Sequence, residues 1–153
     1  MRAVDGRPRM LVSACLLGVM CRYDGGSQAI DGLDALIDRY EVIPICPEQL
    51  GGLPTPRTPS ERRDGGVYAR DGANVTDAFA RGANEAVRIA RLYGARLALL
   101  KARSPSCGFG MIYDGSFTGR TVPGMGVAAE ALSKAGVTVF TEEQLSQLID
   151  AQE

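Results

Sequence analysis

The chain has 153 residues, of which 45% are hydrophobic and 23% charged, and its formal net charge is −1. This composition is ordinary for a globular protein with one core. Proteins that bind nucleic acid usually carry an excess of basic residues, so the net charge argues against a nucleic-acid partner. No apolar run approaches the roughly 20 residues that span a bilayer, and the basic N-terminus lacks the apolar stretch of a secretory signal. We therefore predict one cytoplasmic domain over residues 1–153, without a membrane partner and with residues 1–8 as a loose N-terminal tail.

The sequence contains no histidine. Because histidine is the usual general base and the commonest metal ligand, its absence excludes Ser-His and Cys-His nucleophilic mechanisms and the common zinc hydrolase sites. The chemistry must use cysteine, carboxylates, hydroxyls, lysine or arginine. The four cysteines are Cys15, Cys21, Cys46 and Cys107. They form no Cys-x-x-Cys motif, and a disulfide framework is not expected in a cytoplasmic protein.

Apolar runs and amphipathic segments alternate along the chain. Strands are predicted over residues 10–14, 41–46, 95–100 and 137–140. Helices are predicted over residues 30–40, 77–93, 127–135 and 141–150, with Thr76 as a cap, Gly94 as a C-terminal glycine and a capping box at Thr141–Gln144.

The connections between these elements carry their own signals. Pro44 interrupts the second strand, which weakens that assignment because proline removes a ladder donor. The proline-rich stretch 47–59 is predicted to hold no regular structure, and a small hairpin is predicted over 67–75 around Asp71-Gly72. A second long loop is predicted over 101–124.

Four strand–helix repeats predict a single Rossmann-like α/β domain. The fold class is about four parallel strands with helices on both faces and a small β-hairpin insertion. The natural strand order, numbering the four strands along the chain, is 2-1-3-4.

Three cysteines follow three different predicted strands. Cys15 lies just past the first strand, Cys46 ends the second, and Cys107 lies in the loop after the third. Ligands bind open parallel sheets at the carboxyl ends of the strands, so these cysteines should converge at one edge. Convergent thiolates favour a soft metal or an iron–sulfur cluster over inert buried thiols. Their wide spacing is unlike local zinc motifs, and three ligands would leave one iron open.

Other polar residues follow the same edge. Glu48, two residues after Cys46, is the best proton carrier in a chain without histidine. Ser104 and Ser106 flank Pro105, where they either cap a turn or hydrogen-bond to substrate or cluster sulfur.

Two Tyr-Asp-Gly segments echo each other and contain Asp24 and Asp114. Arg22, Arg57 and Arg103 either bind an anionic or carbonyl group or are solvated surface charges. From this placement we assign substrate contacts to four residues: Arg22, Asp24, Ser106 and Asp114.

Several long motifs point to a known family. SACLLGVMCRYDG, CPEQLGGLPTPR, GANVTDAF, KARSPSCG and IYDGSFTG, spread over about residues 10–140, together resemble the TudS-like thiouracil desulfurase family. The resemblance implies a Rossmann-like domain that carries a 4Fe–4S cluster on three cysteines, with one iron left open. The implied ligands are Cys15, Cys46 and Cys107, and the implied catalytic residues are Glu48 and Ser104. Cys21 would be a non-ligand neighbour or a substitute ligand.

The implied reaction is non-redox desulfuration of a small thiolated base, thiouracil to uracil plus sulfide. The thiocarbonyl sulfur would bind the open iron, while Glu48 delivers a proton or activates water. An exposed iron also implies a cluster that aerobic preparation can remove. The alternative is a non-enzymatic iron–sulfur or zinc-binding sensor module.

Overall fold

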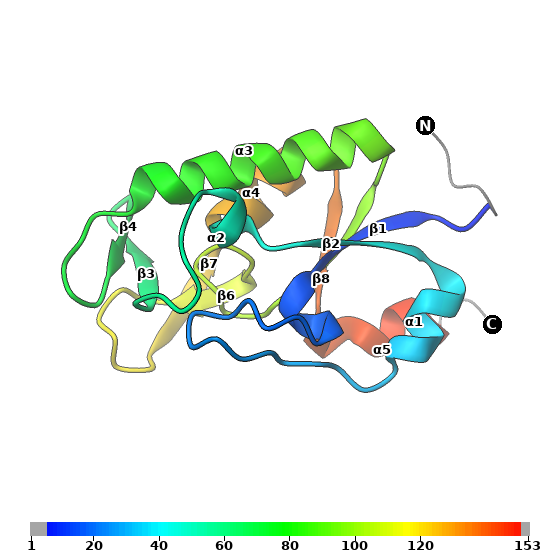
Figure 1. The fold of residues 1–153 in the computed structure, drawn as a ribbon, viewed down its shortest axis with the longest axis horizontal. Helices are drawn as coiled ribbons and strands as arrows, with labels where there is room; N and C mark the ends of the chain where they lie inside the picture. Colours follow the sequence, from blue (N-terminus) through cyan, green and yellow to red (C-terminus); the bar gives the residue numbers. More distant parts are fainter. Residues whose placement is uncertain (1–5, 151–153) are drawn as a thin grey trace.

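The structure is a computed structural model and describes residues 6–150. Its centre is a four-stranded parallel sheet in the order β2-β1-β5-β8 (Figure 1). The strands are β1 (Arg9–Ser13), β2 (Glu41–Ile45), β5 (Leu97–Leu100) and β8 (Thr138–Thr141). All four predicted strands are present, and the predicted order 2-1-3-4 is confirmed.

Helices cover both faces of the sheet, which confirms the predicted fold class (Figure 1). They are α1 (Leu33–Arg39) and α5 (Leu145–Asp150) on one face and α3 (Thr76–Tyr93) and α4 (Val127–Lys134) on the other. Side chains alternate along β1, so Leu11 packs with the core under α3 and α4, while Met10 and Val12 pack with the core under α1 and α5. Because both faces are buried, the strand reads as a continuous apolar run.

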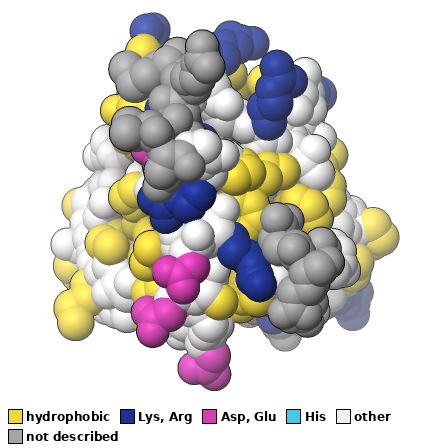
Figure 2. Space-filling model, turned by 90° about the vertical axis from the view of Figure 1, so that its right-hand side faces the viewer, with side chains coloured by type: hydrophobic (Ala, Val, Ile, Leu, Met, Phe, Trp, Pro, Cys, Tyr) yellow, Lys and Arg dark blue, Asp and Glu magenta, His cyan; other side chains and the backbone are white. Residues whose placement is uncertain are grey.

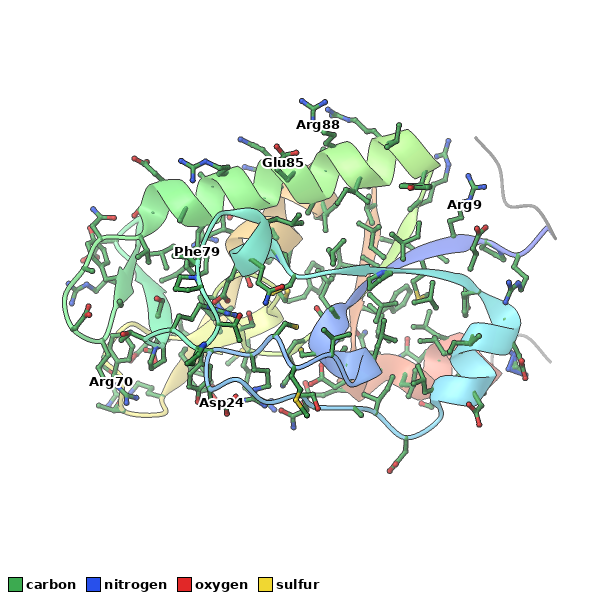
Figure 3. All side chains as sticks on the ribbon, in the orientation of Figure 1. Arg9, Asp24, Arg70, Phe79, Glu85 and Arg88 are labelled. Carbon is green, nitrogen blue, oxygen red and sulfur yellow. The ribbon has the colours of Figure 1, made fainter. Side chains whose placement is uncertain are left out.

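The long helix α3 buries one stripe and exposes the other. Phe79 is 2% exposed and points into the molecule, whereas Glu85 and Arg88 lie on the outer face (Figure 3). Gly94 ends the helix with a φ of 66°, as the predicted C-terminal glycine requires. Thr76 was expected to be the cap but is the first helical residue, and Val75 is the N-cap. The Thr76 hydroxyl instead accepts a hydrogen bond from the Val67 amide at 2.9 Å, so it fastens the helix to β4 (Gly66–Ala69).

Three details differ from the sequence predictions. The stretch 47–59 is not wholly irregular, because Pro47 opens the short helix α2 (Pro47–Leu50), where a first-turn proline loses no hydrogen bond. The hairpin predicted around Asp71-Gly72 is present, because Tyr68 and Asn74 form an antiparallel bridge and the Val75 amide donates to the Val67 carbonyl at 2.9 Å. The strand β3 (Ser60–Arg63) is an addition, and it pairs with β4 across the turn Asp64-Gly65. The loop after β5 contains a second hairpin of β6 (Phe109–Tyr113) and β7 (Thr121–Met125).

Pro44 does lie within a strand. β2 is at the edge of the sheet, where a missing N–H donor is tolerated. The capping box at Thr141 and Gln144 is also present, and it opens the turn η2 (Glu142–Gln144) that leads into α5.

The two ends of the sheet differ in character. β1 and β2 run toward η1 (Ala14–Leu17), α2 and the hairpins (Figure 1). Figure 2 shows the opposite end, where apolar, basic and acidic side chains are interspersed. Of the predicted tail, residues 1–5 lie outside the described residues, and the Pro8 carbonyl accepts a 2.9 Å hydrogen bond from the Glu41 amide. No helix within residues 6–150 has the length and apolar character to cross a membrane.

Candidate metal and catalytic site

A cavity of about 520 Å³ opens at the carboxyl ends of the strands. Its wall combines thiols, hydroxyls and charged groups from η1, α2, the proline-rich loop and the turn before β6. The lining residues on which the site is built are Cys15, Cys21, Cys46, Glu48, Arg57, Ser104, Ser106 and Cys107. The predicted convergence of the cysteines at one sheet edge is therefore what the structure shows.

Each cysteine is brought to the cavity by a different structural element. Cys15 lies in η1, directly after β1, and Cys46 is the N-cap residue of α2, directly after β2. Cys107 closes the turn that follows β5, and its side chain is 5% exposed. Cys21 comes from the loop after η1 and is 3% exposed. All four are free thiols.

Burial makes three of these thiols weak acids. Desolvation, reinforced by the neighbouring thiols, raises the pKa of Cys15 to about 12 and that of Cys21 to about 12. Burial also raises the pKa of Cys107, to about 11. Hydrogen bonds from Ser13 and Ser106 act in the opposite direction and offset part of this rise in pKa. A metal binds the thiolate form of cysteine, so these thiols lose their protons when the metal binds. The metal–sulfur bonds must therefore offset the free-energy cost of removing those protons.

The donor set decides what kind of metal group fits. Within residues 6–150, no three His, Cys, Asp or Glu side chains lie close enough to hold a single metal ion. A cubane cluster distributes its cysteines over different irons and so needs sulfur atoms further apart than one tetrahedral zinc does. An all-sulfur set that comes from three separate strand ends is chemically suited to an iron–sulfur cluster, and its wide sequence spacing is unlike that of local zinc motifs.

Glu48 lies in the first turn of α2, and both of its oxygens are engaged. Oε1 accepts a 2.8 Å hydrogen bond from Arg57 Nε, and Oε2 accepts a 3.0 Å hydrogen bond from the Ser106 hydroxyl. Its side chain is 14% exposed. Glu48 thus joins the proline-rich loop to the turn that carries Cys107.

The turn 104–107 shows the turn-capping role, one of the two roles that the sequence allowed for its serines. The Ser104 hydroxyl accepts hydrogen bonds from the amides of Ser106 at 3.1 Å and Cys107 at 3.0 Å, which is a turn-capping role. Ser104 Oγ also lies 3.1 Å from Ser106 Oγ. Ser106 Oγ in turn lies 3.6 Å from Cys107 Sγ, so the two hydroxyls, Glu48 and a thiol form one network.

Two glycines allow α2 to sit where it does. A Cβ on Gly82 of α3 would lie 1.9 Å from the Pro47 carbonyl oxygen, and one on Gly51 would lie 2.0 Å from the Ala78 carbonyl oxygen. The two helices therefore touch backbone to backbone, and this contact sets the position of Glu48.

The remaining predicted residues divide into two groups. Arg22 lines the cavity and hydrogen-bonds to Gln28. Asp24 and Asp114 are not among the lining residues. Asp24 Oδ1 accepts from the Gly26 amide at 2.9 Å, and Figure 3 shows Asp24 on the outer loop. Asp114 makes the same turn with the Ser116 amide at 2.9 Å, and the Ser116 hydrogen bonds lower its pKa.

Sequence reasoning missed Ser13 and the aromatic part of the wall. Ser13 ends β1, is 2% exposed, and its hydroxyl accepts from the Lys101 amide at 2.9 Å. Its place at a strand end was the signal that could have identified it. Tyr113 and Phe117 reach the wall from the second hairpin, and Arg70 lies over the Phe117 ring at 5.4 Å. No sequence signal for that hairpin was recognised.

Comparisons with known proteins agree with this geometry. The family model for 2-thiouracil desulfurase matches residues 10–144. The uncharacterized protein YbbK of Bacillus subtilis (strain 168) is 37% identical over 150 residues, covering 92% of this chain and 99% of YbbK. The solved structure of TudS, a [4Fe-4S]-dependent thiouracil desulfidase, superposes with a TM-score of 0.89 at 45% identity, covering 95% of this chain and 98% of TudS. The chain belongs to the 2-thiouracil desulfurase family.

Proposed function

We propose that this protein is a hydrolytic desulfidase that converts a thiolated pyrimidine such as thiouracil into uracil and sulfide. The observation that carries the proposal is the meeting of Cys15, Cys46 and Cys107 with the Glu48 carboxylate in one cavity. Family membership and the likeness to a [4Fe-4S]-dependent desulfidase give the reaction class.

We assign the three cysteines as the ligands of a 4Fe–4S cluster. When bound, such a cluster with three cysteine ligands supplies an open Lewis-acidic iron for the sulfur of the substrate. Cys21 is left as a buried neighbour, whose carbonyl oxygen lies 3.8 Å from Cys46 Sγ.

The acid–base work falls to Glu48 and the two serines. Glu48 takes a proton from the water that attacks the thiocarbonyl carbon. The Ser104 hydroxyl can donate to Ser106 Oγ while Ser106 donates to Glu48 Oε2, so a proton can move along this row of oxygens. The C–S bond breaks, a C–O bond forms, and sulfur leaves as sulfide, so no oxidant or reductant is consumed.

The competing sensor function is less well supported. The matched family is named for 2-thiouracil desulfurase, and the solved TudS structure, at 45% identity, is that of a [4Fe-4S]-dependent thiouracil desulfidase, so both comparisons favour an enzyme. A purely structural cluster would not require a partly buried carboxylate and a hydroxyl network at its side. The cytoplasmic location stays a prediction of the sequence.

The test is anaerobic reconstitution with iron and sulfide, followed by incubation with 2-thiouracil, 4-thiouracil and thiolated nucleosides. We expect equal amounts of sulfide and desulfurated base from at least one of them. A fully loaded, coloured protein that releases no sulfide from any member of the panel would contradict the proposal and favour the sensor.

A further inference from the structure

We propose that Arg57 is the positioning residue of this site: it holds the Glu48 carboxylate in its working orientation and does not itself bind the substrate. The inference rests on the proposed function, in which Glu48 moves the proton. Arg57 comes from the proline-rich loop after α2, and its side chain is 7% exposed although it is charged. A buried charge of this kind requires partners, and those partners reveal its role.

The guanidinium nitrogens of Arg57 donate hydrogen bonds to other groups of the protein. Nε donates to Glu48 Oε1 at 2.8 Å, and Nη2 donates to the Cys21 carbonyl at 3.0 Å. Nη1 donates to the Thr55 hydroxyl at 2.9 Å and to the Pro54 carbonyl at 3.2 Å. Every nitrogen of the guanidinium therefore has an acceptor, which argues against Arg57 as a free cation for an anionic or carbonyl group.

These contacts fix Glu48 from one side only. Its other oxygen accepts from Ser106, whose hydroxyl lies 3.1 Å from Ser104 Oγ and 3.6 Å from Cys107 Sγ. The carboxylate is thus held between a cation and a hydroxyl, with its plane determined by both. Without Arg57, Glu48 can rotate, and Ser106 can donate to the Cys107 sulfur instead.

Arg57 also joins two loops that border the cavity. Its amide donates to the Tyr23 carbonyl at 2.7 Å, while its side chain reaches the Cys21 carbonyl. The segment 21–23 and the proline-rich loop therefore meet at Arg57, so one residue sets both the carboxylate and the wall beside it. A lysine offers a point charge that cannot reach these acceptors simultaneously.

The test compares three anaerobically reconstituted proteins with the wild type: R57Q, R57K and the control R88Q. Arg88 is an arginine on the outer face of α3, with a side chain 78% exposed, away from the cavity. We expect R57Q to lose about 100-fold in kcat with KM changed less than about threefold, because misplaced groups cost rate more than affinity. R57K should lose about tenfold in kcat, and R88Q should match the wild type.

Two further readouts separate positioning from other roles. Iron content and visible absorbance should be the same in all four proteins, because no cluster ligand is changed. In R57A, added millimolar guanidinium should restore part of the lost kcat, and it should restore none in E48Q.

An unchanged kcat in R57Q or R57K would overturn the inference. So would a rise in KM at constant kcat, since it would mean that Arg57 binds the substrate. If R57Q loses iron or fails to fold, R57K decides, because it keeps the cation. A loaded wild type that is itself inert would refute the proposed function and the inference with it, whereas an active wild type with an equally active R57K refutes only the inference.

Discussion

The Ser106 hydroxyl donates a 3.0 Å hydrogen bond to Oε2 of Glu48, although 58 residues separate them in the chain. Ser106 is 3% exposed and precedes Cys107, while Glu48 follows Cys46 by two positions. The bond therefore ties two of the three strand ends that carry the proposed cluster ligands. It also places a carboxylate and a hydroxyl in the same cavity as the thiols, which is what a proton-transfer step at that place requires.

Replacing Glu48 by glutamine should separate cluster binding from turnover. Glutamine keeps the shape of the side chain and can still accept from Ser106, but it cannot take a proton. We expect E48Q to keep its iron content and to lose about 100-fold or more in kcat. The comparison with E85Q, on the outer face of α3 (Figure 3) with a side chain 43% exposed, controls for loss of a charge. Full turnover in E48Q would remove Glu48 from the reaction.

The cysteines should fall into two classes. C107S removes one of the three proposed ligands, so we expect loss of the iron–sulfur absorbance and of sulfide release together. C21S is the matched control, since Cys21 is also a buried thiol in the cavity wall. Iron content close to the wild-type value is expected for C21S. If C21S lost the cluster and C107S kept it, the ligand assignment would be wrong.

The buried thiols predict how stability depends on pH in the cluster-free, reduced protein. Burial raises the pKa of Cys15 and Cys21 to about 12 and that of Cys107 to about 11. A cysteine thiol in the unfolded chain has a pKa of about 8.5. Between about pH 8.5 and 11 the unfolded chain loses protons that the folded chain keeps, so the free energy of unfolding falls as pH rises.

Thermal melting between pH 7 and pH 10.5 checks this sign. The wild type should lose stability more steeply above pH 9 than a C15A/C21A double variant, which has fewer shifted thiols. Equal slopes for the two proteins would show that these thiols are not desolvated in the folded state.

The close approach of α2 and α3 predicts a large effect of one methyl group. In G82A the new Cβ would lie 1.9 Å from the Pro47 carbonyl oxygen, so α2 must move away and take Glu48 with it. We expect a loss of about 2 kcal/mol in the free energy of unfolding and a fall in kcat. Denaturant unfolding and steady-state kinetics measure both. A80S, at an exposed position of the same helix, should change neither.

The sheet was predictable because its signals are local. Apolar runs such as 95–100 identify buried strands, and the alternation with helices gives the parallel order. Cys15, Cys46 and Cys107 could be placed from this alone, since each follows a different strand. A C-terminal glycine predicts the helix end at Gly94, and a capping box of threonine and glutamine predicts the helix start at Thr141. Both helix boundaries are present in the structure.

The contacts within the site were not predictable in the same way. Arg57 was one of several arginines with equal claims, and only its meeting with Glu48, Thr55 and the Cys21 carbonyl distinguishes it. Asp71-Gly72 and Asp64-Gly65 carry the same turn signal, and β4 pairs across both turns. The strand β3 has the polar sequence SERR, so no apolar alternation marks it as a strand. The contact between Gly51 and Ala78 depends on helices that are not adjacent in the chain.

In the proposed reaction, water replaces sulfur without a change of oxidation state. Loaded protein is incubated with 2-thiouracil in water enriched in ¹⁸O, without added oxidant or reductant, and the product is analysed by mass spectrometry alongside a sulfide assay. We predict uracil that carries one ¹⁸O atom and an equal amount of sulfide. Unlabelled uracil, or turnover that requires a reductant, would contradict this hydrolytic reaction.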